Sequence, residues 1–138
     1  MALNLTVDTN IIIDALQKRE PWREAAEQII LLAAAGKITA AISASTVTDI
    51  YYIVSRKSGK AQAEDAISRL ALLMDFTGVD KSDCLKALAS DVDDFEDALL
   101  SICAAKAKSK YIITHNVKNF ANSKVPAITP EAFLKQIA

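Results

Sequence analysis

The chain has 138 residues, about half of them hydrophobic and a quarter charged, which is the composition of one globular domain, and we expect that domain to cover residues 1–138. No apolar run approaches the ~20 residues that a membrane span needs, and no secretory signal is recognisable, so a membrane protein is excluded as an interpretation. The net charge of −1 excludes nucleic-acid binding through overall positive charge, so any such binding requires a local basic patch.

The cysteines and the single histidine do not form a metal or disulfide motif. Cys84 and Cys103 lack CxxC spacing and stand in apolar helical contexts, so we expect two buried, reduced thiols in a cytosolic protein. His115 is alone, and with thiols so scattered it cannot complete a zinc site.

The first half of the chain alternates between short β-rich runs and helical periodicity. In chain order it predicts a strand over 3–8, helices over 9–16 and from Pro21-Trp22 to Gly36, a strand over 39–43, and helices over 45–57 and 61–74. Gly36 has the place of a C-terminal helix cap, and Ser45 or Thr46 is the expected N-cap of the helix over 45–57.

The second half continues the alternation. It predicts a strand over 76–79, helices over 81–89 and 93–108, strands over 111–114 and 126–129, and a terminal helix that begins at Pro130. Strands separated by helices imply right-handed crossovers and a mostly parallel sheet. The predicted fold is therefore α/β, a three-layer α/β/α sandwich.

Acids and amides follow several of the predicted strands. Asp8 ends the first strand, and Asp49 lies on the helix after the second. Further acids crowd residues 91–97 at the start of a helix, and His115-Asn116 with Asn119 follow the strand over 111–114. Because parallel sheets bind ligands at the carboxyl ends of their strands, these segments converge on one edge of the sheet.

Each of these residues also has a simpler interpretation. Asp8 alone is well explained as a helix cap, and the acids over 91–97 favour a helix N-terminus by roughly 0.3–1 kcal/mol each. Asp97 fits that account less well, since its apolar neighbours predict a half-buried helix face. Asp49 fits it least, because it interrupts an apolar helix with no lysine or arginine one turn away to pair with it.

A cation would resolve the repulsion within such a cluster. Carboxylates held together have raised pKa values unless a positive charge compensates them, and hard oxygen ligands select Mg²⁺ or Mn²⁺. Such an ion polarises a phosphodiester and lowers the pKa of bound water. The residues therefore indicate metal-assisted hydrolysis of a phosphate ester.

Four motifs, taken together, resemble the PIN domain family over nearly the whole chain. They are VDTNIIID at 7–14, STVTDIYYIV at 45–54, DFEDALLSICA at 94–104 and YIITHNVKNF at 111–120. Within that family the chain is similar to the small prokaryotic stand-alone members, including the VapC-like toxins of toxin–antitoxin pairs. The resemblance implies an α/β/α fold, a Mg²⁺- or Mn²⁺-dependent ribonuclease, a homodimer and often an inhibitory antitoxin.

The resemblance also implies roles for individual residues. Asp8 and Asp97 become metal-site acids, Asp94 assists them, and Asp49 is the third catalytic acid. In the supporting positions, hydrogen bonds from Asn10 and Thr114 orient ligands or water, and Asn116 and Asn119 stand in the last motif.

Two positions depart from the family pattern. Asp49 stands where relatives most often have glutamate, so it reaches less far and acts through a bridging water. Asn116 or Asn119 stands where relatives commonly have aspartate, and an amide keeps an oxygen ligand but removes a charge. We expect one firmly held metal, a weaker second one, and reduced activity; the alternative is an inactive PIN scaffold that binds RNA or protein.

Basic residues near the acids would have to hold the RNA. Lys118 is the best candidate, since it lies in the loop beside Asn116, and Arg56 and Lys57 are further candidates. The simpler interpretation is that these cations favour helix ends.

Two other classes of enzyme also gather aspartates at strand ends. A phospho-acceptor receiver domain needs adjacent acids near the first strand and a lysine after a late strand, and this chain has neither. A dehalogenase-type phosphatase needs aspartate two residues after the first, where this chain has Asn10. Both classes are less well supported than the nuclease.

Overall fold

A computed structural model describes residues 3–138. In the first half, the elements are β1 (Leu3–Val7), α1 (Thr9–Leu16), α2 (Arg23–Ala34), β2 (Ile38–Ser43), α3 (Ala44–Ser58) and α4 (Lys60–Leu73). The second half contains β3 (Asp75–Thr77), α5 (Lys81–Leu88), α6 (Phe95–Lys106), β4 (Tyr111–Ile113), the 3₁₀ helix η1 (Val117–Phe120), β5 (Ala127–Ile128) and α7 (Pro130–Ile137). The order of predicted strands and helices is confirmed.

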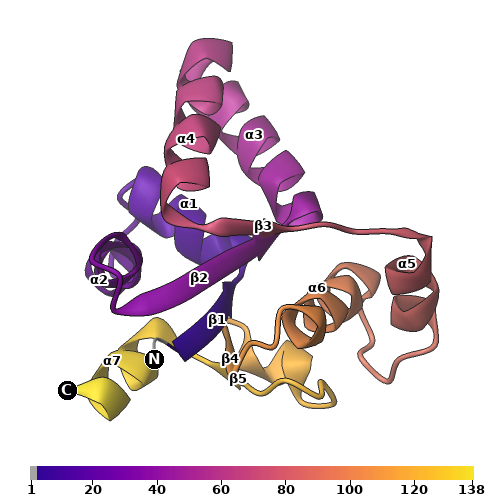
Figure 1. Cartoon of the computed structure of the whole chain (residues 1–138). Helices are drawn as coiled ribbons and strands as arrows, with labels where there is room; N and C mark the ends of the chain where they lie inside the picture. The colour runs from indigo at the N-terminus through magenta and orange to yellow at the C-terminus, as the bar shows by residue number, and fades with distance from the viewer. Residues whose placement is uncertain (1–2) are drawn as a thin grey trace.

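The strands form one five-stranded sheet in the order β3-β2-β1-β4-β5, and every neighbouring pair is parallel. Helices cover both faces: α1 to α4 and α7 pack on one side, whereas α6 with α5 covers the other (Figure 1). The predicted α/β/α sandwich with a parallel sheet is therefore correct. Among the residues described, no helix is long and apolar enough to cross a membrane.

The main core lies between the sheet and the larger helical layer. The central strand contributes Leu5 and Val7, and α1 contributes the run from Ile11 to Ile13, all of them buried. A helix that is apolar on all sides belongs in an interior, and α1 indeed contacts α2 and α3 as well as the core. This burial fixes α1 directly behind the end of β1.

The helix ends differ from the sequence-based expectation in two places. The N-cap of α3 is Ser43, whose hydroxyl accepts a hydrogen bond from Thr46 N, so the prediction of Ser45 or Thr46 as the cap was wrong. Helix α6 begins at Phe95 rather than at residue 93, because Asp94 is its cap. In both cases a short polar side chain bonds the backbone of the first turn and sets the start of the helix.

Both cysteines are free thiols. Cys103 is buried, and burial raises the pKa of its thiol to about 11, so it stays protonated at neutral pH. Cys84 is half-buried between α5 and α6.

Candidate active site

The candidate site lies where the order of the strands reverses. From β1 the chain adds β2 and β3 on one side and then returns to add β4 and β5 on the other. The crevice at the carboxyl ends of β1 and β4 is therefore a topological switch point, where open parallel sheets bind ligands. Asp8 directly follows β1 and Thr114 directly follows β4, so the strand register sets their side chains next to each other.

Asp8 is held by three hydrogen-bond donors. Thr9 N donates to Oδ1 at 2.8 Å, Thr114 Oγ1 donates to Oδ2 at 2.8 Å, and Asn10 Nδ2 lies 3.3 Å from the same oxygen. The first contact makes Asp8 the N-cap of α1, so the simple interpretation of this residue is correct but incomplete. Burial raises the pKa of Asp8, although the bonds from Thr114 and Thr9 oppose that rise.

The start of α6 brings a second group of acids to the crevice. Asp94 accepts a hydrogen bond from Asp97 N at 3.0 Å and caps the helix. Asp97 is half-buried, as its apolar neighbours predicted. Its pKa is raised to about 6, first by burial and then by the negative charges of Asp94 and Asp8, while a hydrogen bond from Asn119 lowers it. Asp97 and Asp8 therefore lie close enough to repel each other.

The partner of Asp49 is another acid. Asp49 is half-buried on α3, and its side chain is hydrogen-bonded to Glu96 on α6. This bond is the main reason why the pKa of Glu96 is raised to about 7; burial and the charges of Asp49, Asp94 and Asp8 add to it. Two carboxyl groups can share a hydrogen bond only when one of them is protonated, and the raised pKa of Glu96 identifies Glu96 as the donor.

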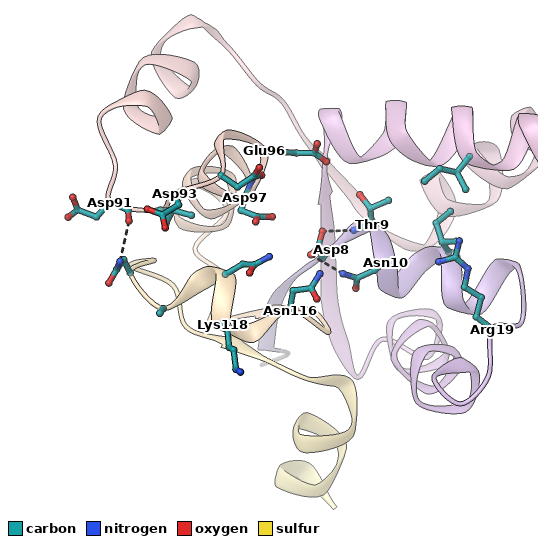
Figure 2. Close-up of a pocket in the computed structure, with 17 residues that line it drawn as sticks. Asp8, Thr9, Asn10, Arg19, Asp91, Asp93, Glu96, Asp97, Asn116 and Lys118 are labelled. Carbon is teal, nitrogen blue, oxygen red and sulfur yellow. Dashed lines mark hydrogen bonds between the residues drawn. The ribbon is translucent and has the colours of Figure 1, made fainter.

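Among residues 3–138, the acids of the cluster form no ion pair with a cation, and the ion pairs that are present lie elsewhere. The acids face a cavity of about 590 Å³, with Asp8 on one wall and the acids of α6 on another (Figure 2). The acids that line it are Asp8, Asp91, Asp93, Asp94, Glu96 and Asp97.

The chemistry of these donors fits a divalent cation. All are oxygens, the pKa values of Asp8, Glu96 and Asp97 are raised, and among residues 3–138 none of the six forms an ion pair. As the side chains stand, however, no three His, Cys, Asp or Glu residues in the described part of the chain are arranged to hold a metal ion. Two of the acids are engaged by other side chains, Asp49 by Glu96 and Asp97 by Asn119. A cation would have to be shared by Asp8 and Asp97, with amide or water oxygens completing its ligands.

The remaining predicted residues divide into two groups. Asn116, Asn119 and Lys118 line the cavity, and Asn116 N also donates to Thr114 Oγ1 at 3.0 Å. Arg56 and Lys57 are not among its lining residues; they lie in the last turn of α3. Asp49 does not line it either and reaches the cluster through Glu96.

A buried acid–histidine pair beside the site was not predicted. His115 Nε2 lies 2.5 Å from Asp14 Oδ2, and Asp14 is only 1% exposed. The ring of Trp22 packs against His115 with centroids 5.0 Å apart, and His115 N approaches Asn10 Oδ1 at 3.4 Å. The pair therefore fixes the loop after β4 against α1. The signal in the sequence was Asp14 itself, a charged residue directly after three isoleucines.

Thr114→Val tests how the loop is held. We expect it to lower the free energy of unfolding by about 1–3 kcal/mol, because valine has the same shape but leaves Asn116 N unpaired and removes the donor to Asp8. Chemical denaturation measures the change. Thr48→Val is the matched control, since Thr48 is exposed on α3, and its replacement should change stability by less than about 0.5 kcal/mol. Equal effects of the two substitutions would contradict this role of Thr114.

Glu96→Gln tests the repulsion within the cluster. Folding raises the pKa of Glu96 above its ordinary value of 4.5 to about 7, so its contribution to stability is present below pH 4.5 and is lost as the pH rises to 7. In metal-free buffer we expect the substitution to raise Tm at pH 8 by roughly 1–2 °C, an amount kept small by the exposure of Glu96, and to leave Tm unchanged at pH 5. Glu64→Gln, on the exposed face of α4, should have no pH-dependent effect. A lower Tm at pH 8 would show that the acids do not repel one another.

Comparison with known proteins gives consistent results for sequence and fold. The profile of the PIN domain matches residues 4–118. Ribonuclease VapC1 of Aquifex aeolicus (strain VF5) is 27% identical over 135 residues, which covers 94% of this chain and 92% of that protein.

Solved structures with the same fold include the following two. VapBC2 from Rickettsia felis, bound to a DNA fragment from its promoter, aligns with a TM-score of 0.72 at 18% identity and covers 92% of this chain and 98% of that one. A toxin–antitoxin complex from Klebsiella pneumoniae aligns with a TM-score of 0.69 at 22% identity and covers 91% of this chain and 97% of that one. At these identities the likeness concerns the fold alone.

Proposed function

The chain belongs to the PIN domain family, and we propose that it is a metal-dependent endoribonuclease that serves as the toxin of a toxin–antitoxin pair. The observation that carries this proposal is the opposition of Asp8 and Asp97 across a cavity at the topological switch point, with no cation paired to either. The 27% identity to a protein named as a ribonuclease supports the choice of RNA as substrate.

In this proposal Asp8 and Asp97 hold Mg²⁺ or Mn²⁺, and Asp94 assists. A bound divalent ion polarises the phosphodiester and lowers the pKa of the attacking water. Thr114 and Asn10 keep the Asp8 carboxylate in one orientation through their hydrogen bonds, and supporting contacts of this kind determine how well ligands are placed.

Asp49 has a different proposed role, because it does not line the cavity and is hydrogen-bonded to Glu96. Glu96, with a pKa of about 7, would exchange a proton with the reacting oxygens, directly or through water, and Asp49 would hold Glu96 in position through their hydrogen bond. In the net reaction a water molecule loses one proton and its oxygen forms a bond to phosphorus, a bond from phosphorus to a ribose oxygen breaks, and that ribose oxygen gains a proton.

The proposed partners follow from the relatives. A solved structure of the same fold is a toxin–antitoxin complex, so we propose an antitoxin protein as the inhibitor of this chain. A homodimer is the assembly that the resemblance to the PIN domain family implies, and we propose it as well. RNA is the substrate, and Lys118 at the rim of the cavity contacts its backbone.

A catalytically weak PIN scaffold that binds RNA or protein is the second candidate. It is favoured by one observation: no three His, Cys, Asp or Glu side chains in the described residues are arranged to hold an ion, and the loop after β4 lines the cavity with the amides Asn116 and Asn119.

Cleavage of structured RNA by the purified protein in Mn²⁺ separates the two candidates. The nuclease proposal requires cleavage that Asp8→Asn removes. RNA binding without cleavage at any divalent-ion concentration would favour the scaffold.

A further inference from the structure

The cavity has a cationic end that the sequence motifs do not mark. Arg19 lines it together with Ile13 and Ile53, away from the acids of α6. In Figure 2 the side chain of Arg19 rises from the loop after α1 toward the cavity, on the far side of Asp8 from Asp97. The cavity is therefore negatively charged at one end, where the acids lie, and positively charged at the other, where Arg19 lies.

The guanidinium of Arg19 is largely without partners. Among residues 3–138 it forms no ion pair, and its side chain makes one weak hydrogen bond, from Nη2 to Gln17 Oε1 at 3.4 Å. Burial raises the pKa of Asp14 and the charge of Arg19 opposes that rise, but the two side chains are not in contact as a salt bridge. Most donors of its planar fork are thus available to a ligand.

The backbone holds Arg19 in this place at some cost. Helix α1 ends in a left-handed turn at Lys18, with φ 52°, and Arg19 N donates back to Asp14 O at 3.0 Å. Glycine adopts this conformation without strain, whereas a lysine with φ > 0 is strained. The turn directs the residue after Lys18 back over α1 and toward the cavity.

We propose that Arg19 binds a backbone phosphate of the RNA strand, next to the phosphodiester that is cleaved at Asp8 and Asp97. An arginine fork matches phosphate oxygens in a bidentate manner, and phosphate contacts fix the register of a strand without reading its sequence. Lys118 also lines the cavity and is a second cation available to the RNA strand. This inference rests on the proposed nuclease function.

Arg19→Gln tests it in kinetics. Because phosphate binding by Arg19 acts equally on bound substrate and transition state, we expect KM for a single-stranded RNA oligonucleotide to rise about 5- to 30-fold with kcat within about 2-fold of wild type. Arg19→Lys should recover part of the loss, since it restores the charge without the fork. Arg69→Gln is the matched control: it removes the same charge from the exposed surface of α4 and should leave KM unchanged.

The salt dependence of binding provides a second measurement. In the Asp8→Asn background, the slope of log Kd against log salt concentration should fall by about 0.7 with Arg19→Gln, as for the loss of one phosphate contact on a single strand. An unchanged slope and KM would overturn the role of Arg19 while leaving the nuclease intact. A wild-type protein that neither cleaves nor binds RNA would overturn both. Loss of antitoxin binding alone would assign Arg19 to a protein partner instead.

Discussion

Replacing Asp8 or Asp97 by asparagine is expected to reduce RNA cleavage by about 100-fold or more, with the fold retained. Each substitution removes one of the two carboxylates that face each other across the cavity, and an amide has no negative charge with which to hold a divalent ion. Initial rates on a structured RNA in Mn²⁺ measure the loss. The effect should fall on kcat/KM, since transition-state stabilisation is what is removed.

The choice of asparagine separates catalysis from folding. Asp8 also caps α1, and asparagine is as good an N-cap as aspartate, so Asp8→Asn should unfold at nearly the same denaturant concentration as wild type. Asp80→Asn is the matched control, because it alters the cap of α5 far from the cavity and should leave cleavage unchanged. Retention of the wild-type rate within about 3-fold by both Asp8→Asn and Asp97→Asn would refute the nuclease assignment.

The sequence predicted those parts of the site that strand order alone brings together. Alternating strands and helices imply parallel crossovers, and parallel strands carry their following residues to one edge. Asp8 and the residues that follow the strand over 111–114 were therefore predicted to meet at one edge, and the register of β1 with β4 places Asp8 and Thr114 in hydrogen-bond contact. Asp97 could be singled out because it interrupts an apolar helix face, and that face is half-buried.

The parts that escaped prediction depend on how helices and loops are oriented. Asp49 was identified as a charge that needs a partner, but only the packing of α3 against the start of α6 reveals that the partner is Glu96. Arg19 was missed because its place depends on a left-handed turn at Lys18, where no glycine marks the turn in the sequence. Tertiary geometry, not local pattern, determines both contacts.

The raised pKa values of Asp97 and Glu96 also lower the stability of the metal-free protein at high pH. Asp97 and Glu96 both bind protons more tightly in the folded state than in the unfolded chain, so ionising them at high pH opposes folding. Sites that gather like charges for function commonly reduce stability in this way. A bound cation would reverse the effect, and this reversal can be measured without any substrate.

Removal of divalent ions is expected to abolish cleavage, and their return is expected to stabilise the fold. With a chelator the wild type should show no RNA cleavage, and Mn²⁺ should restore it. At pH 8, Mn²⁺ at about 100 times its Kd contributes roughly 2.7 kcal/mol to stability, which raises Tm by roughly 5–10 °C for a chain of this size. At pH 5 the shift should be smaller, because Asp97 and Glu96, with pKa values of about 6 and 7, are protonated there.

The thermal shift distinguishes binding in the cavity from binding elsewhere. Asp8→Asn should lose most of the shift, since Asp8 is one of the two shared ligands, whereas Asp80→Asn should keep it. Because the amides of Asn116 and Asn119 add no charge, calorimetric titration should find one tight Mn²⁺ ion per chain and a second that binds far more weakly. Full cleavage in the presence of chelator would contradict metal-assisted hydrolysis. An equal thermal shift in wild type and Asp8→Asn would show that Mn²⁺ does not bind at this cluster.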